Sequence, residues 1–169
     1  PLKKIIHDKI PDWKISSRNK EQAFAIDLLM DPSVKVVSLV GRAGSGKTLC
    51  AIAAGLQQTI GLRGSNPYDR MIVSRPVQPL GKDIGFLPGT MEEKMLPWLM
   101  PIQDNLQFLL GGDQNTLKKY VSKGKIEIEA LTYIRGRSIA NAFVIIDEAQ
   151  NLTAHEIKTI MTRVGEGTK

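Results

Sequence analysis

The chain has 169 residues, of which 42% are hydrophobic and 24% are charged, the composition of a globular protein with a buried core. No apolar run approaches the ~18 residues of a membrane-spanning helix, and a single cysteine excludes an internal disulfide. Lys and Arg outnumber Asp and Glu by 23 to 17, and the resulting net charge of +6 attracts polyanions such as nucleic acid. We therefore expect a cytoplasmic protein without membrane association. Because the chain begins at Pro1 and stops just after a helical pattern, we expect one domain, residues 1–169, from a longer protein.

Helical and extended patterns alternate along the chain. Three segments predict helices: residues 20–30 after a candidate N-cap at Asn19, residues 47–60, and a segment after Thr153. Four β-rich runs predict strands: residues 34–40, 70–74, 126–131 and 143–147. The run 34–40, VKVVSLV, has the composition of a central parallel strand that is buried on both faces. This alternation predicts an α/β fold with a mostly parallel sheet flanked by helices.

Two segments need separate treatment. Residues 75–115 form a proline-rich insertion in which we expect helical stretches between proline breaks, laid over the sheet edge. Near the end of the chain, Thr153 and Glu156 have the spacing of a capping box. The helix after it is predicted to place four apolar residues on one face: Ile157, Ile160, Met161 and Val164.

A phosphate-binding motif follows the first predicted strand. The sequence GRAGSGKT matches G-x-x-x-x-G-K-[ST], with a strand before it and a helix after it. Its glycines permit close approach of the backbone, so that N–H groups and the helix N-terminus face the phosphates. Lys47 adds a charge at the β- and γ-phosphates, and Thr48 offers a hydroxyl to Mg²⁺. The predicted nucleotide-binding residues are Gly41, Arg42, Ala43, Gly44, Ser45, Gly46, Lys47 and Thr48.

An acidic pair complements this loop. Asp147 and Glu148 follow the apolar run FVII, at the strand end where open parallel sheets bind ligands. Asp147 is the predicted Mg²⁺ ligand beside Thr48, and Glu148 is predicted to orient and deprotonate the attacking water, acting with Lys47 as a catalytic residue. A second acid next to the metal ligand favours hydrolysis over a static switch. The guanine-reading motif [NT]-K-x-D does not occur after the loop, which favours ATP over GTP.

Other polar residues leave alternatives open. The amide of Gln22 suits the adenine edge, but Gln22 also lies at the spacing of a helix cap with Asn19. Arg75, Arg135 and Arg137 follow predicted strands, and they suit nucleic-acid phosphates, γ-phosphate sensing or a solvated charged loop.

Five strings together resemble the ATPase domain of the PhoH-like family: GRAGSGKT, VSRPVQPLGKDIGFLPG, EEKMLPWLMPIQDNL, ALTYIRGRS and VIIDEAQNLT. The insertion resembles the subgroup in which this domain follows a PIN ribonuclease domain. The resemblance runs over residues 17–169, and it implies a RecA-like P-loop core related to superfamily 1 helicases, ATP hydrolysis, RNA unwinding coupled to the PIN nuclease, and ring-like homo-oligomers. It assigns adenine reading to Gln22, phosphate and metal binding to Lys47 and Thr48, and the acidic motif to residues 147–150. The family's Gly-Asp sensor motif and its PIN domain are not within the 169 residues.

The sequence therefore predicts a helicase-like ATPase that binds and hydrolyses ATP with Mg²⁺ and acts on RNA. An alternative function is an ATP-gated module that controls a partner nuclease without unwinding activity. A small-molecule kinase is a third possibility, but an acceptor pocket and lid arginines are not recognisable in the sequence.

Overall fold

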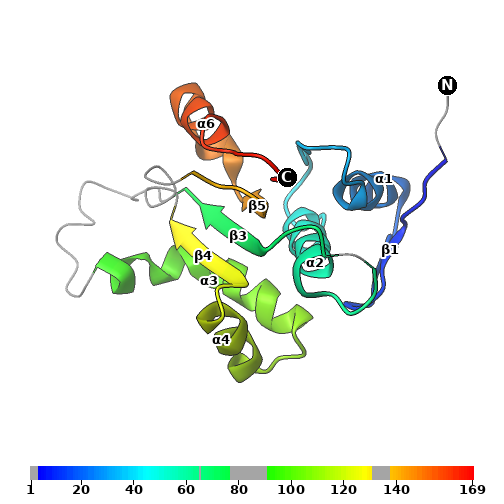
Figure 1. The fold of residues 1–169 in the computed structure, drawn as a ribbon, viewed down its shortest axis with the longest axis horizontal. Helices are drawn as coiled ribbons and strands as arrows, with labels where there is room; N and C mark the ends of the chain where they lie inside the picture. Colours follow the sequence, from blue (N-terminus) through cyan, green and yellow to red (C-terminus); the bar gives the residue numbers. More distant parts are fainter. Residues whose placement is uncertain (1–3, 65, 77–90, 131–137) are drawn as a thin grey trace.

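The computed structural model describes residues 4–64, 66–76, 91–130 and 138–169, and its centre is a three-stranded parallel sheet (Figure 1). The central strand β3 (Arg70–Arg75) lies between β4 (Ile126–Ala130) and β5 (Ala142–Ile146). Ser74 pairs with Ile146 and Arg75 with Ala130, so the carboxyl ends of all three strands meet at one edge. The parallel α/β architecture predicted from the sequence is confirmed.

Helices surround this sheet. Their bounds are α1 Lys20–Met30, α2 Lys47–Ile60, α3 Met91–Leu109, α4 Gln114–Ser122 and α6 Ala154–Met161, with a 3₁₀ turn η1 at Ala149–Asn151. The predictions for α1 and α2 are confirmed to the residue. The predicted caps are also present: Asn19 accepts a hydrogen bond from the Gln22 N–H, and Thr153 with Glu156 forms the reciprocal capping box of α6. Among the described residues no helix is long and apolar enough to cross a membrane.

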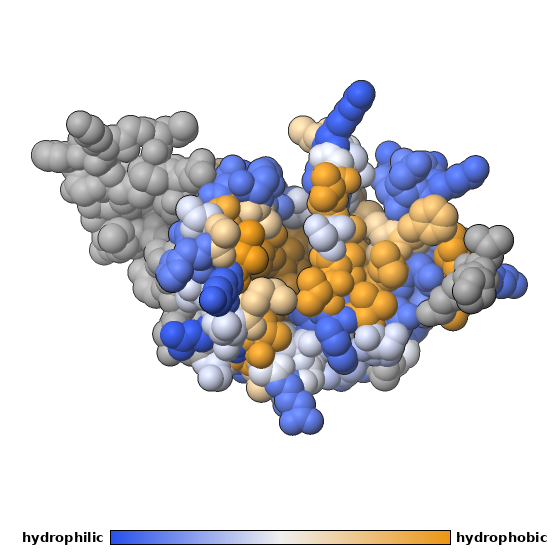
Figure 2. All heavy atoms as spheres, turned by 90° about the horizontal axis from the view of Figure 1, so that it is seen from above, coloured by the Kyte–Doolittle hydropathy of each residue, from blue (hydrophilic) through white to orange (hydrophobic). Residues whose placement is uncertain are grey.

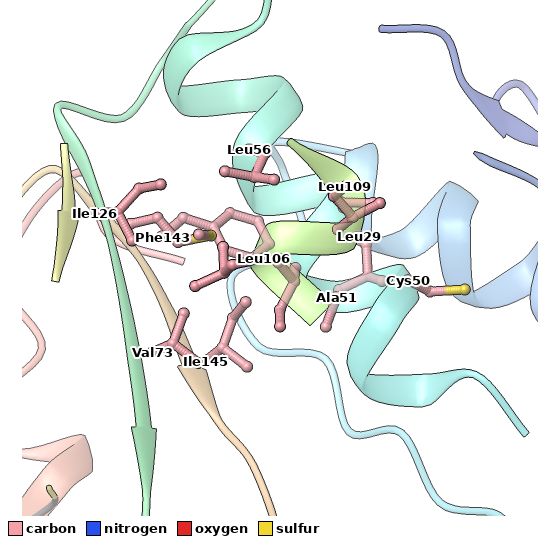
Figure 3. Close-up of a cluster of buried hydrophobic side chains, with 14 of the residues drawn as sticks. Leu29, Cys50, Ala51, Leu56, Val73, Leu106, Leu109, Ile126, Phe143 and Ile145 are labelled. Carbon is pink, nitrogen blue, oxygen red and sulfur yellow. The ribbon is translucent and has the colours of Figure 1, made fainter. Parts of the chain in front are cut away.

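The main core lies between one face of the sheet and helices α1, α2 and α3 (Figure 3). Val73, Phe143 and Ile145 from the sheet face Leu56 of α2 and Leu106 of α3. Removing these apolar side chains from water is the dominant stabilising term of such a fold, at about 25 cal/mol per Å². Helix α2 is packed closely against two strands, and this packing fixes its position relative to the edge where the strands end.

The run 34–40 takes no regular secondary structure, so its prediction as a central strand is wrong. Val36 and Val40 are 65% and 95% exposed, whereas Val37 and Leu39 pack partly against the main core. A strand is stabilised by a hydrogen-bonded neighbour, and the run 34–40 pairs with none of the three strands of the sheet. On the open side of β5, Lys169 N–H donates to Ala142 O, and Val144 N–H donates to Lys169 O. Figure 2 shows apolar side chains gathered across the middle of the face that lies uppermost in Figure 1.

The proline-rich segment also differs from its prediction. Residues 91–109 form one helix, α3, which continues through Pro97 and Pro101 instead of breaking at each of them. Ile102, Leu106 and Leu109 of α3 are buried in the main core, and this burial outweighs the backbone hydrogen bonds that the prolines remove. Residues 77–90 of the predicted insertion lie outside the described part of the chain.

The last helix is shorter than its predicted apolar face. Helix α6 ends at Met161, so Val164 lies beyond it and instead forms a bridge with Ile139. Ile160 is buried with Ile72, Ile139 and Ala142, whereas Ile157 and Met161 are 44% and 48% exposed.

Two features were not predicted. Residues 9–16 form a small antiparallel hairpin, β1 (Lys9–Ile10) with β2 (Ile15–Ser16), in which Ile10 is fully buried. Helix α4 follows α3 after a turn and is capped by Asp113, whose carboxylate accepts from the Asn115 and Thr116 N–H groups.

Candidate functional site

The loop of residues 41–46 leads directly into α2 and leaves that helix's first N–H groups facing outward. Gly44 and Gly46 have φ angles of 74° and 83°, in the left-handed region that glycine tolerates best. Gly46 is the N-cap of α2 and has no side chain to accept from the first turn. Residues 41–45 are exposed. A helix N-terminus approached by such a loop is an anion-binding site, and here it suits phosphate.

The ammonium group of Lys47 lies over this loop. Its Nζ donates to Gly41 O and Arg42 O at 2.8 Å each, and it lies 3.4 Å from Ser45 Oγ. These are neutral acceptors, so an incoming phosphate oxygen is a stronger partner for the same charge. The geometry places the predicted phosphate-binding lysine at the mouth of the loop.

The loop meets the acidic pair at Thr48. Thr48 Oγ1 donates to Asp147 Oδ1 at 2.8 Å, a contact between residues 99 positions apart in the chain. The Asp147 N–H in turn donates to Ser74 O at 2.8 Å, which fixes the residue after β5 against the end of β3. A hydroxyl and a carboxylate are the hard oxygen ligands that Mg²⁺ prefers, so the two residues fit the predicted metal. Magnesium binds few protein ligands and keeps several waters.

Glu148 is held in a strained position. Its φ of 53° lies in the left-handed region, which is costly for a residue with a side chain. One carboxylate oxygen, Oε2, accepts from Gln150 Nε2, and the other, Oε1, lies 3.9 Å from Arg75 Nη2. The side chain is 38% exposed. Strain of this kind gathers at functional sites, and here it accompanies a carboxylate that lies beside Arg75 at the end of β3.

Gln22 contacts the phosphate loop through its side chain. Its Nε2 donates to Ser45 O at 3.0 Å, and its Oε1 accepts from the Arg18 N–H at 2.8 Å. The amide is therefore hydrogen-bonded on both sides by backbone groups. Both the cap and a position beside the nucleotide loop are observed, and adenine reading stays a prediction.

The sequence placed Arg75 after a predicted strand and left its role open, and its contacts with the acidic pair were not predicted. Its guanidinium lies 3.8 Å from Asp147 Oδ2 as well as 3.9 Å from Glu148 Oε1, which puts it inside the candidate site. A signal for these contacts was available, because the strands that precede Arg75 and the acidic pair were both predicted to be parallel. Parallel neighbours such as β3 and β5 end at the same edge of the sheet. Arg135 and Arg137 lie outside the described residues.

Residues 14–169 match the family described as PhoH-like protein. The chain belongs to this family. It is 51% identical to protein PhoH2 of Bacillus subtilis (strain 168) over 172 residues, which cover 99% of the chain and 38% of that protein. It is 40% identical to protein PhoH2 of Mycolicibacterium smegmatis over 156 residues, covering 92% of the chain and 35% of that protein. The PhoH-like protein of Synechocystis is also 40% identical, over 134 residues that cover 79% of the chain and 39% of that protein.

Membership of the PhoH-like family, as predicted from the sequence, is thus confirmed, and this family is one of nucleotide-binding P-loop ATPases. The chain spans less than two-fifths of the length of these relatives. The contact between Thr48 and Asp147, which brings the glycine loop to the acidic strand end, is consistent with membership of this P-loop family.

Proposed function

We propose that this PhoH-like chain binds ATP with Mg²⁺ and hydrolyses it. The observation that supports this most directly is the 2.8 Å contact between Thr48 Oγ1 and Asp147 Oδ1. It joins the phosphate loop to the acidic strand end, which an isolated glycine turn or an isolated acidic turn would not do.

In this proposal each residue has a defined task. Backbone N–H groups of the loop and of the α2 N-terminus bind the phosphates, and Lys47 moves from the loop carbonyls to the phosphate oxygens. Thr48 and Asp147 would hold the metal. Bound Mg²⁺ neutralises charge on the phosphates and steadies their geometry. Glu148 orients the attacking water and takes its proton.

We further propose that ATP hydrolysis drives work on RNA, in cooperation with a PIN nuclease domain. We also propose that several copies of the chain assemble into a ring. The net charge of +6 and the resemblance to the PIN-linked subgroup support this. The relatives are two to three times as long as the matched region, which leaves room for a further domain in them. A neighbouring subunit that supplies an arginine would raise turnover by about 10³–10⁵. Specific turnover should then rise with protein concentration.

The decisive experiment compares ATP hydrolysis by the wild type and by Glu148→Gln, each with RNA, with DNA and without nucleic acid. We expect Glu148→Gln to bind ATP normally but to hydrolyse it about 10²–10⁴ times more slowly, since it keeps the shape and loses the base. Glu166→Gln, the same change at an exposed position, is the matched control. Wild-type turnover in Glu148→Gln would refute the role of Glu148.

Strand displacement separates the two functional alternatives. RNA-stimulated hydrolysis with displacement of a duplex supports a helicase. Stimulation without displacement supports an ATP-gated module that controls the nuclease. Transfer of phosphate to a small-molecule acceptor would instead revive the kinase alternative.

A further inference from the structure

One charged residue of the site has no task in the proposed reaction. Arg75 is the last residue of β3, its side chain is 24% exposed, and its guanidinium reaches two carboxylates at once. Nη1 lies 3.8 Å from Asp147 Oδ2, and Nη2 lies 3.9 Å from Glu148 Oε1. The inference that follows rests on the proposed function, because it concerns the same nucleotide site.

The sheet register explains why Arg75 is there. Ser74 pairs with Ile146, and the Asp147 N–H donates to Ser74 O, so the ends of β3 and β5 lie side by side. Arg75 follows Ser74 as the last residue of β3, and Asp147 follows Ile146 directly after β5. Both contacts are longer than a hydrogen bond, so they are ionic contacts in which charge counts more than the direction of the N–H groups.

Positive and negative charges lie close together at the acidic strand end. The guanidinium of Arg75 lies beside the carboxylates of Asp147 and Glu148. Asp147 has its other oxygen, Oδ1, on Thr48, and its side chain is only 13% exposed. A divalent cation that reaches Thr48 and Asp147 therefore arrives where a guanidinium already neutralises the carboxylate. Two cations at one carboxylate repel each other, and this repulsion is screened little in a partly buried site.

We propose that Arg75 is the counter-charge of the Asp147–Glu148 pair in the nucleotide-free site and that Mg²⁺ takes over this place when it arrives with ATP. Arg75 is then a positioning residue that sets how strongly nucleotide binding depends on Mg²⁺. The same guanidinium lies beside Oε1 of Glu148, so a metal that displaces Arg75 from Asp147 also changes the charge that faces Glu148.

The test measures binding, not turnover. The dissociation constant of the purified protein for a fluorescent ATP analogue is measured once with Mg²⁺ and once with EDTA. The ratio of the value in EDTA to the value in Mg²⁺ is then compared among variants. In Arg75→Gln the uncompensated carboxylates repel metal-free ATP and attract Mg²⁺ more strongly. We expect the ratio to increase about three- to tenfold, the scale of one partly buried ion pair. Arg75→Lys keeps the charge, and because the contacts are ionic it should stay within about twofold of the wild type.

Arg70→Gln is the matched control. Arg70 begins the same strand, and its Nε lies 3.2 Å from Glu127 Oε1, so the substitution also removes one arginine from an ion pair, but at the opposite end of β3. Its ratio should equal that of the wild type. Equal ratios in Arg75→Gln and Arg70→Gln would overturn the inference. Failure of the wild type to bind ATP, or binding by Lys47→Ala as strong as that of the wild type, would instead overturn the proposed function.

A second measurement does not depend on the stability of Arg75→Gln. The side-chain Nε–H signal of Arg75 in the NMR spectrum, assigned by its loss in Arg75→Lys, should shift when Mg²⁺ is added to protein already saturated with ADP in EDTA. An unchanged signal at saturating Mg²⁺ would contradict displacement of the guanidinium.

Discussion

Several charged and polar side chains of the nucleotide site have partners within the chain. Lys47 contacts loop carbonyls, Thr48 contacts Asp147, and Arg75 contacts the acidic pair. Groups that are already ordered lose little further entropy on binding, so these contacts preorganise the site for ATP. Binding then exchanges one set of partners for another.

Gln22 allows a prediction at this scale. Its amide joins the Ser45 carbonyl to the Arg18 N–H, so Gln22→Ala should loosen the phosphate loop without touching one base in particular. We expect affinity for ATP and for GTP to fall by a similar factor, about two- to fivefold for one lost hydrogen-bonded link. Competition binding with both nucleotides measures this. A loss confined to ATP would show that Gln22 reads adenine.

Among the elements, α2 has two functions. Its N-terminus faces the phosphate site, and its body packs on β3 and β5, with Ile52, Ala53 and Ala54 fully buried. The close packing is possible because Gly55 faces the sheet: a Cβ there would lie 2.5 Å from Met71 Sδ and 2.9 Å from Phe143 Cδ1. The distance of α2 from the sheet therefore sets the position of Thr48 relative to Asp147.

Gly55→Ala tests this coupling. The added methyl must push α2 away from the sheet or displace Met71 and Phe143, and overpacking of this kind costs about 1–3 kcal/mol. We expect a lower denaturation midpoint together with weaker Mg·ATP binding. In Gly41→Ala the closest atom to the new methyl is the movable Ser45 Oγ at 3.3 Å, so its midpoint should change little. An unchanged midpoint in Gly55→Ala would show that the packing is looser than the structure indicates.

On the scale of the whole molecule, one carboxylate ties the N-terminal hairpin to the loop after α2. Asp12 Oδ2 accepts from the Leu62 N–H at 2.6 Å, from the Arg63 N–H at 3.0 Å and from Gln57 Nε2 at 2.8 Å. Burial alone would raise the pKa of Asp12, but these hydrogen bonds and the nearby Arg63 charge outweigh it and hold the pKa below its ordinary value of 3.8. The ionised form is therefore favoured by folding.

Acid should weaken this tie in a predictable way. Because the folded-state pKa is depressed, the contribution of Asp12 to stability is fully present above pH 3.8 and is lost as the pH falls through the lower folded-state value. Denaturant midpoints at about pH 6 and about pH 3 should therefore differ more in the wild type than in Asp12→Asn. Asp8→Asn, at an exposed position of the same hairpin, should behave as the wild type does. Parallel pH dependence in Asp12→Asn and the wild type would contradict this assignment.

The sequence by itself determined the features that depend on near neighbours. Helices α1 and α2 and the caps at Asn19 and Thr153 involve residues three or four positions apart, and the structure has them as predicted. The phosphate loop was equally readable, because its chemistry resides in eight consecutive residues.

Only the tertiary structure decided what depends on distant partners. The β-branched run 34–40 lacks a ladder because a strand needs a hydrogen-bonded neighbour, and α3 continues through Pro97 and Pro101 because the core buries its far end. The sequence left three roles open for Arg75, and only the register of β3 and β5 placed it beside two carboxylates. A charge acts through distance in space, and the order of residues along the chain does not give that distance.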